Sequence, residues 1–306
     1  MATADLGLTT TRAPFIENAQ QNGDMFIYQP YELYSEENQD TWRRLYRRIR
    51  PLWEKYANRK FMQGVENLML DPDNIPRLDD VNKYLQPLTA FEARAVAGYV
   101  PAFIFFDCLR QRQFPTTITI RDGQKLDYLP EPDIFHDIAG HVPMHTDKRF
   151  ADVLVRFGEV ARTAAQRAQQ MSHSDDAVRD RIVESNIRAM ARFFWYTIEF
   201  GLMRQSNELK VYGSGLLSSC SEIQHCIESP MVQRYPAQLE WIINQYFEID
   251  HFQELLFIVE SFDHLFDLVD MLENWLHEGK LDNTAGGEPG ANPEDLNSFL
   301  NAEVTG

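Results

Sequence analysis

Two closely spaced histidines are the first residues whose types suggest chemistry. His136 and His141 lie five positions apart in the segment FHDIAGH at 135–141. On a straight α-helix this spacing puts the two rings about 140° apart, too far for one metal ion. Gly140 and Pro143 predict that the helix ends or bends there, which can bring both imidazoles to one point. Two helix-end histidines bonded to backbone carbonyls remain the alternative.

A carboxylate inside an apolar stretch supplies a third candidate ligand. Glu199 lies in the segment FFWYTIEFGL at 193–202. An ionised carboxylate in such surroundings is costly unless it is paired or binds a metal. Two histidines and one carboxylate form the facial triad that leaves three positions of a non-haem Fe(II) open for oxygen chemistry. A salt bridge from Glu199 to Arg192 or Arg204 is the alternative.

A di-iron site is a competing interpretation. Two segments match the helical Glu-x-x-His unit of di-iron carboxylate bundles, Glu222-x-x-His225 and Glu248-x-x-His251. Such a bundle also needs two further helical glutamates, and Glu222 follows the loop-like Gly-Ser-Gly at 213–215. The sequence contains no Gly-x-Gly-x-x-Gly, no P-loop and no Gly-x-Ser-x-Gly nucleophile motif.

The composition of the 306-residue chain excludes several classes of protein. It has 29 basic and 46 acidic side chains, a formal net charge of −17, which argues against nucleic acid or an anionic membrane as partner. No apolar run reaches the roughly 18 residues of a membrane span, and the N-terminus lacks the features of a signal peptide. Three cysteines are too few, and odd in number, for a disulfide framework. We therefore expect a cytoplasmic protein.

Helical periodicity dominates the elements that must position the candidate ligands. Helices are predicted over 37–57, 59–70, 79–86, 90–96, 102–109, 134–140, 148–170, 177–203, 231–245, 250–256 and 262–277. Short strands are predicted over 116–120, 209–212 and 256–258. We expect a mainly α fold, with a few short β-strands in a single domain over 25–278. A loose N-terminal segment over 1–24 and an acidic, largely loose tail over 279–306 flank it.

Four ordered segments resemble a known protein family. They are LDYLPEPDIFHD at 126–137 with GHVP at 140–143, FWYTIEFGL at 194–202, YGSGLLSS at 212–219 and VESF at 259–262. They are similar to the tetrahydropterin-dependent aromatic amino acid hydroxylases, most closely the bacterial-type phenylalanine 4-hydroxylases. The resemblance runs from about 25 to 278, which corresponds to the family's catalytic domain. It implies a monooxygenase that converts L-phenylalanine to L-tyrosine with O₂ and tetrahydrobiopterin or a related tetrahydropterin at Fe(II).

The resemblance implies a role for each matching residue. His136, His141 and Glu199 would bind the iron, and Arg121 would pair with the substrate carboxylate. The other residues implied in substrate binding are Tyr128, Leu129, Pro132, Phe114, Trp195 and Ser218. Of these, Phe114, Pro132 and Trp195 would line the ring pocket, and Ser218 would orient the iron-binding histidines. The residues implied in pterin binding are Tyr99, Val100, Ala102, Phe105 and Asp137, with the Phe105 ring stacked on the pterin.

The choice of phenylalanine rests on three positions. Ile258 is apolar where the tyrosine hydroxylases carry an acid, and Trp195 and Phe114 are similar to the phenylalanine enzymes. Hydroxylation of tryptophan, or of phenylalanine at the meta carbon, is the alternative within the family, and a non-catalytic binding protein is the alternative outside it. The chain departs from the usual family pattern at Ala139, Met144-His145-Thr146, Ser214, where alanine is usual, and Cys220-Ser221.

Two parts of longer family members lack a counterpart in this sequence. The segment 1–24 is too short for the regulatory ligand-binding domain, and the tail over 279–306 lacks the heptad helix that assembles tetramers. We expect a monomer without allosteric activation by substrate. Its partners would be the small-molecule amino acid and, as protein candidates, pterin-recycling enzymes.

Overall fold

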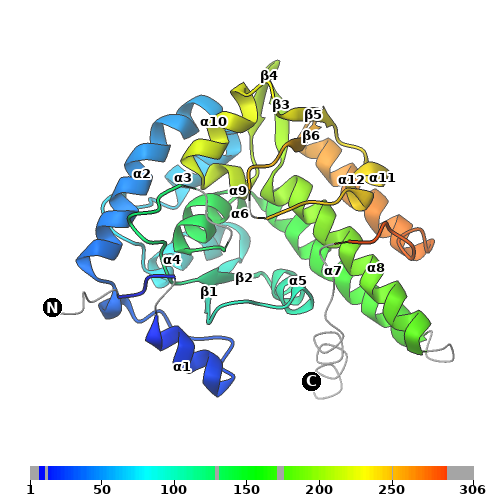
Figure 1. Cartoon of the computed structure of the whole chain (residues 1–306), viewed down its shortest axis with the longest axis horizontal. Helices are drawn as coiled ribbons and strands as arrows, with labels where there is room; N and C mark the ends of the chain where they lie inside the picture. Colours follow the sequence, from blue (N-terminus) through cyan, green and yellow to red (C-terminus); the bar gives the residue numbers. More distant parts are fainter. Residues whose placement is uncertain (1–6, 11–12, 128–130, 171–175, 250, 288–306) are drawn as a thin grey trace.

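Helices form most of the chain, and the strands belong to two small sheets (Figure 1). The computed structural model describes residues 7–10, 13–127, 131–170, 176–249 and 251–287. This mainly α architecture confirms the fold class that the helical periodicity predicts. None of the helices in these ranges is both long and apolar enough to cross a membrane.

The helices and strands follow in this order along the chain. The α-helices are α1 (Pro14–Asn22), α2 (Glu36–Tyr56), α3 (Arg59–Asn67), α4 (Leu78–Thr89), α5 (Ala102–Arg110), α6 (Val142–His145), α7 (Lys148–Gln170), α8 (Asp176–Phe194), α9 (Ser214–Leu217), α10 (Cys220–Glu228), α11 (Leu239–Asn244) and α12 (Phe262–His277). A 3₁₀-helix, η1 (Tyr31–Leu33), and two π-helices, η2 (Phe135–His141) and η3 (Trp195–Glu199), complete the helices. The strands are β1 (Glu92–Val96), β2 (Gln113–Thr117), β3 (Leu202–Gln205), β4 (Glu208–Val211), β5 (Gln233–Pro236) and β6 (Leu255–Val259).

The two sheets connect segments that are distant in the sequence. β1 and β2 form a parallel pair in which Glu92 lies opposite Gln113. The second sheet has the order β4-β3-β6-β5, with β3 antiparallel to β4 and parallel to β6. Because β3 follows η3 directly, the pairing of Leu202 with Ile258 fixes the chain just after Glu199.

The long helix α2 shows how the sequence ties the outer layer to the site. It begins with a capping box in which Ser35 Oγ accepts a hydrogen bond from the Asn38 N–H at 3.2 Å. Its apolar stripe is buried in the core, and Trp53 within this stripe donates its indole N–H to the Leu217 carbonyl at 2.7 Å. α2 therefore holds α9, which lies directly against η2.

Several elements differ from the sequence-based predictions. Residues 90–96, predicted as a helix, contain β1, because α4 ends at Ala90 with φ of 60° and the following residues pair with β2. The helix predicted over 177–203 ends at Phe194 and continues as η3 and β3. The predicted helix over 231–245 consists of β5 and then α11, and residues 251–254 form no helix. The strand predicted over 116–120 lies three residues earlier, as β2.

Both flanking segments are more ordered than expected where they are described. The segment over 1–24, expected to be loose, contains α1, and Leu8 in it is buried and pairs with Ile120 through the Ile120 N–H. Residues 279–287 of the expected loose tail lie against α7 and α8. Asp282 accepts two hydrogen bonds from Arg167 at 2.5 and 2.6 Å and one from Asn186 at 3.0 Å. We call residues 279–287 the strap.

Removing the Asp282 carboxylate is expected to destabilise the fold. Asp282→Ala removes the bidentate ion pair with Arg167, whose side chain is only 21% exposed, and leaves this guanidinium without its carboxylate partner. We expect the free energy of unfolding to fall by about 2 kcal/mol, measured by urea denaturation. Asp73→Ala is the matched control, because the Arg47–Asp73 pair is 69% and 55% exposed and such pairs contribute about 0–1 kcal/mol. Equal effects of the two substitutions would contradict a structural role for the strap.

Candidate active site

Two π-helical turns carry the three candidate metal ligands. His136 and His141 lie in η2, and Glu199 ends η3. Hydrogen bonds in a π-helix run between residues five apart, so these residues lie one turn apart on the same side. The wider turn therefore brings together two histidines that an α-helix would separate. Gly140 allows η2 to pack closely on α9, because a Cβ at this position would lie 2.9 Å from the Ser214 carbonyl oxygen.

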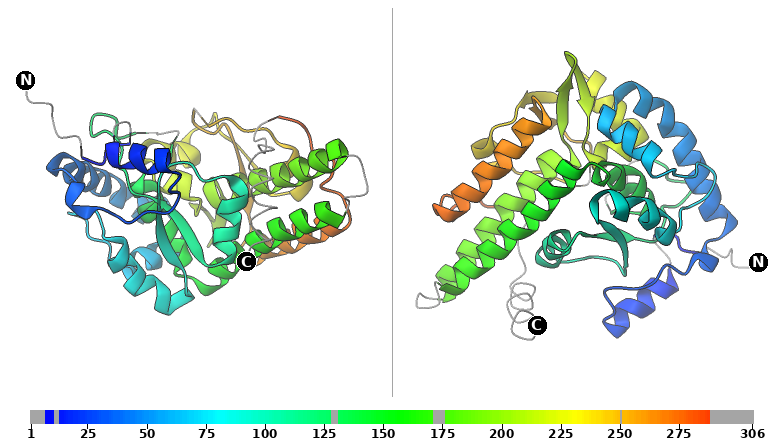
Figure 2. Two further views of the ribbon diagram at one scale, coloured as in Figure 1. Left: turned by 90° about the horizontal axis from the view of Figure 1, so that it is seen from below. Right: turned by 180° about the vertical axis from the view of Figure 1, so that it is seen from behind.

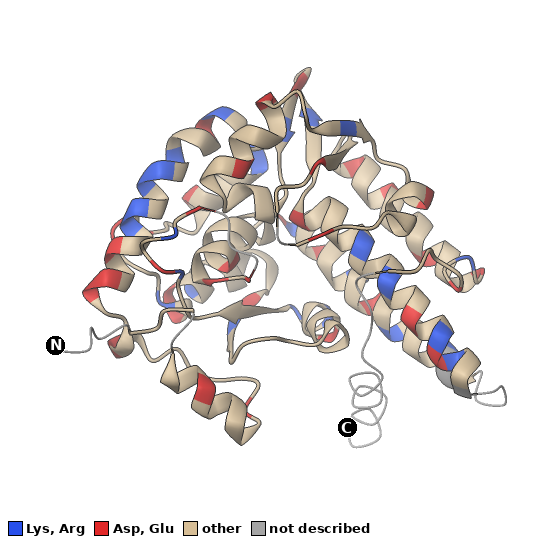
Figure 3. Ribbon diagram, viewed as in Figure 1, with Lys and Arg blue, Asp and Glu red and all other residues tan. Residues whose placement is uncertain are grey.

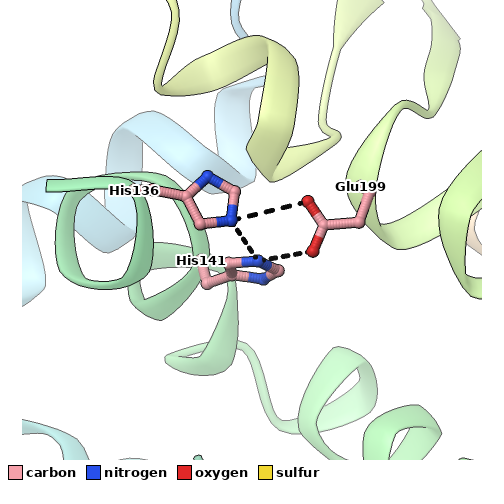
Figure 4. Close-up of side chains that lie close together, drawn as sticks. All are labelled: His136, His141 and Glu199. Atoms are coloured by element: carbon pink, nitrogen blue, oxygen red, sulfur yellow. Dashed lines mark hydrogen bonds and ion pairs between the residues drawn. The ribbon is translucent and has the colours of Figure 1, made fainter. Parts of the chain in front are cut away.

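The three side chains point to one location from two elements (Figure 4). His141 Nε2 lies 2.8 Å from Glu199 Oε1 and 3.2 Å from His136 Nε2, and His136 Nε2 lies 3.7 Å from Glu199 Oε2. A six-coordinate ion with bonds of about 2.1 Å holds neighbouring donor atoms about 3 Å apart. The spacing and the donor types therefore fit a facial triad around one iron.

The protonation states suit metal binding. Burial lowers the pKa of His136 to about 4, so its imidazole is neutral and has a lone pair to offer at neutral pH. Burial works against ionisation of Glu199, but the neighbouring imidazoles and the hydrogen bonds from His141 and Ser214 lower its pKa to about 2. The site thus presents a neutral His136 imidazole and an anionic Glu199 carboxylate.

The alternative interpretations of these residues fail on geometry. Arg192 donates to the backbone carbonyls of Ile243, Ala285 and Gly286, and Arg204 pairs with Glu260, so neither neutralises Glu199. Within the described ranges, His136, His141 and Glu199 are the one group of three or more such side chains close enough to share an ion. The structure therefore does not support a di-iron site.

Hydrogen bonds hold the first histidine in place. Ser218 Oγ lies 2.8 Å from His136 Nδ1, which leaves Nε2 directed to Glu199, and the hydroxyl also donates to the Gly215 carbonyl at 3.2 Å. Asp133 Oδ1 accepts the backbone N–H of His136 at 2.9 Å. A hydrogen bond at the second ring nitrogen fixes the tautomer and the orientation of a metal-binding imidazole.

Asp133 also links the metal site to Arg121. The carboxylate accepts from Arg121 Nε at 2.7 Å and from Nη2 at 2.9 Å, while Nη1 donates to the carbonyls of Leu126 and Asp127. Both charged side chains are almost completely buried. Burial opposes both charges, but each charge shifts the pKa of the other group in favour of ionisation, raising that of Arg121 and lowering that of Asp133. The guanidinium is therefore a rigid cation next to the iron ligands.

Two cavities meet at the metal site. The smaller has a volume of about 370 Å³ and the larger about 700 Å³. The residues that line both are Tyr99, Val100, Phe105, Glu131, Pro132, His136 and Glu199. Arg121 and Trp195 line only the smaller cavity, whereas Asp137 and His141 line only the larger one. The geometry thus offers two adjoining spaces for small molecules at the candidate metal site.

The structure assigns only some of the other sequence-predicted residues to a single cavity. Trp195 and Ser218, predicted for the substrate, line only the smaller cavity, and Asp137, predicted for the pterin, lines only the larger one. The residues that line both are Pro132, Tyr99, Val100 and Phe105. Two predicted residues lie on the other side: Phe114 lines the larger cavity and Ala102 the smaller one. Tyr128 and Leu129 lie outside the described residues. Asp137 is buried, which raises its pKa to about 7, and it accepts the Thr117 N–H at 2.6 Å.

Two residues that hold Trp195 in the wall of the smaller cavity were not predicted. Phe247 stacks on Trp195 with ring centroids 4.1 Å apart and planes 9° apart. Gln253 accepts the Trp195 indole N–H at 3.1 Å and donates to the Glu248 and His251 carbonyls. Both lie in a loop between α11 and β6 that has no motif, so their contact with Trp195, about fifty residues earlier, leaves no local signal in the sequence.

A buried acidic side chain, Glu222, holds the loop between α11 and β6. Glu222 accepts the backbone N–H of Gln253 at 3.0 Å, and its other oxygen has no partner among the described residues. Burial raises the pKa of Glu222 to about 7, from an ordinary value of 4.5. The folded protein therefore holds a proton on Glu222 across a pH range in which the unfolded chain has released it.

This shift predicts a pH dependence of stability. Between about pH 4.5 and pH 7 the unfolded chain binds fewer protons than the folded one, so the free energy of unfolding decreases as the pH rises. Glu222→Gln removes this loss. As the pH rises from 5 to 8, the free energy of unfolding of Glu222→Gln is expected to increase by about 2 kcal/mol relative to that of the unmodified protein. Both values are measured by urea denaturation at each pH. Parallel pH profiles for the two proteins would contradict the shift.

Comparisons with known proteins agree with this arrangement. The model of the biopterin-dependent aromatic amino acid hydroxylase family matches residues 28–278. Phenylalanine-4-hydroxylase of Chromobacterium violaceum is 36% identical over 244 residues, which is 80% of this chain and 76% of that protein. A crystal structure of the C. violaceum enzyme with iron(III) and 7,8-dihydrobiopterin has a TM-score of 0.74 and 33% identity. Another, with iron and phenylalanine bound, has a TM-score of 0.72 and 33% identity.

Each alignment with these two structures covers 89% of this chain and 92% of the other. A match of the family model to most of the chain, together with this identity, settles the relationship. The chain therefore belongs to the biopterin-dependent aromatic amino acid hydroxylase family.

Proposed function

We propose that this chain hydroxylates L-phenylalanine to L-tyrosine with O₂ and a tetrahydropterin at one iron. The observation that supports this most directly is the position of the triad at the junction of two cavities, one lined by the buried Arg121 and the Trp195–Phe247 wall. The similar C. violaceum enzyme has been crystallised with iron and phenylalanine, and with dihydrobiopterin. When bound, ferrous iron and the reduced pterin supply the activation of O₂.

The smaller cavity suits an aromatic amino acid. The Arg121 guanidinium is held in place by Asp133, so its positive charge can pair with a substrate carboxylate, and such charge-assisted bonds fix orientation. The stacked rings of Trp195 and Phe247, with Pro132, give an apolar surface for the ring of the substrate. Anchoring the carboxylate at one end places the ring toward His136 and Glu199, which line the same cavity.

The larger cavity suits the pterin. Phe105 lines both cavities and offers an aromatic face for stacking, and the 98–100 backbone supplies polar groups at the rim. Asp137 lines this cavity as a buried acid and can hold a proton near neutral pH. His136, His141 and Glu199 would hold the iron between the two cavities, and the apolar walls keep bulk water from the reacting ring.

The test is an assay of the purified protein with Fe(II), tetrahydropterin and O₂ against phenylalanine, tyrosine and tryptophan in turn. We expect pterin-dependent formation of L-tyrosine from phenylalanine, identified by mass and ring position. A product hydroxylated at the meta carbon, or hydroxytryptophan as the main product, would replace the substrate assignment by the alternative. Absence of any pterin-dependent oxygen uptake would favour a non-catalytic binding protein.

We also propose a monomer that acts in the cytoplasm and has no nucleic-acid partner. All three cysteines are free and buried, as in a reducing compartment. Basic residues lie along α2 among acidic ones (Figure 3), and Arg43, Arg44, Arg47, Arg48 and Arg50 each lie within 4 Å of an acidic oxygen. The positive charges of these five arginines are therefore already paired with acidic side chains. A sedimentation mass near four times 35.6 kDa would contradict the monomer.

A further inference from the structure

Ser214, the first residue of α9, touches two of the three metal-binding side chains. Its Oγ lies 2.9 Å from His141 Nε2 and 3.1 Å from Glu199 Oε2, and also 3.1 Å from the Ile198 carbonyl oxygen. The side chain is 2% exposed, so no bulk water competes for these contacts. A hydroxyl in this place is a property of this chain, since Ser214 is one of the departures noted in the sequence.

The hydroxyl approaches the ligands from the protein interior. Ser214 is not among the described residues that line either cavity, whereas His136 and Glu199 line both. Small molecules would reach a bound iron from these cavities. Ser214 therefore contacts the side chains that would hold the iron and not the space that an incoming molecule would occupy.

The hydrogen-bond inventory selects one acceptor for the Ser214 hydrogen. A serine hydroxyl donates one hydrogen bond, and an imidazole nitrogen that binds a metal has no lone pair left to accept it. With His141 Nε2 engaged, the remaining acceptors are the anionic Glu199 Oε2 and the neutral Ile198 carbonyl. Hydrogen bonds to charged acceptors are the stronger ones, so the hydrogen is directed to Glu199.

We propose that Ser214 is a positioning residue that fixes the rotation of the Glu199 carboxylate for iron. Its hydroxyl donates to Oε2 and leaves Oε1, which lies 2.8 Å from His141 Nε2, available to bind a metal. Ser214 does for the carboxylate what Ser218 does for His136. The inference rests on the proposed iron site and adds a residue that controls how tightly and in what geometry the metal is held.

The experiment compares Ser214→Ala with Ser185→Ala. Ser185 is a matched control, because it is also buried and hydroxyl-bonded, donating to the Leu281 carbonyl at 2.7 Å, but it belongs to the contacts of the strap. Apoprotein of each variant is titrated with Co(II), and the visible d–d absorption spectrum and the Kd are recorded. Substitution of a residue that hydrogen-bonds to a metal ligand typically lowers the metal affinity 10–100-fold.

We expect Ser214→Ala to bind Co(II) about tenfold more weakly, with a changed d–d spectrum, and Ser185→Ala to keep both the affinity and the spectrum of the unmodified protein. A Ser214→Ala protein whose Kd lies within twofold of the original and whose spectrum is unchanged would overturn the role of Ser214. Failure of the unmodified protein to bind one Co(II) per chain would instead overturn the iron site itself. The two failures are therefore distinguishable.

Discussion

Glu199→Gln is expected to lose iron and hydroxylase activity together. The substitution preserves the shape of the side chain but replaces an anionic oxygen donor, which lies 2.8 Å from His141 Nε2, by a neutral amide. Substitution of a residue that only hydrogen-bonds to a metal ligand typically lowers the metal affinity 10–100-fold, and loss of one ligand of three should have a larger effect. We therefore expect the affinity for Fe(II) to fall on the order of 1000-fold. The measurement is iron per chain after dialysis against a fixed free Fe(II) concentration, with tyrosine formation assayed in parallel.

Glu222→Gln provides the matched control for this result. Glu222 is at least as buried as Glu199, but it bonds to the Gln253 backbone and belongs to no metal-binding group among the described residues. The control protein should retain one iron per chain. Full iron binding by Glu199→Gln, or equal loss in both variants, would show that the triad assignment is wrong.

Arg121→Lys is expected to raise the KM for phenylalanine about 10–100-fold. Lysine keeps the positive charge but loses the planar fork that binds a carboxylate, and hydrogen bonds to charged groups contribute about 1.5–3 kcal/mol. The KM for the pterin should change little, because Arg121 lines the smaller cavity and not the larger one. The lost bonds to the buried Asp133 should also lower the free energy of unfolding by about 3 kcal/mol.

Arg192→Lys separates the loss of stability from the loss of substrate binding. Arg192 is fully buried and donates to three backbone carbonyls, but it does not line the described parts of either cavity. We expect this variant to be destabilised with an unchanged KM for phenylalanine, as determined from initial rates under saturating pterin. If both arginine variants raised the KM equally, the effect would come from loosened packing and not from a lost contact with the substrate.

The long helices show where the hydrophobic periodicity of the sequence is sufficient to predict an element. α7, α8 and α12 run side by side in every view (Figures 1 and 2), and the predictions over 148–170 and 262–277 match α7 and α12 at both ends. Each buries one stripe of apolar residues, which is a local property of the sequence. Arg156 joins two of them through ion pairs with Asp270 and Glu273.

The predictions differ from the structure for elements whose secondary structure depends on contacts with segments distant in the sequence. Residues 92–96 contain helix-compatible alanines, but their backbone pairs with residues 113–117. Residues 195–203 continue an apolar helical pattern, yet a Cβ at Gly201 would lie 2.1 Å from the Thr197 carbonyl oxygen and 2.3 Å from the Tyr212 ring. The chain therefore leaves the helix where tertiary packing requires it, and periodicity carries no signal of that packing.

Residue types and their order along the chain identify the chemistry: two histidines and one glutamate in an apolar setting, in segments whose order marks the family. How these three side chains meet depends on the packing of the elements that carry them. The π-helical turns place His136 and His141 on one side, and β3 pairing fixes the chain after Glu199. The Phe247 stack, the Gln253 bond and the Ser214 contacts also arise only in the fold. Side-chain type is a local property, whereas distances between residues far apart depend on how every element packs.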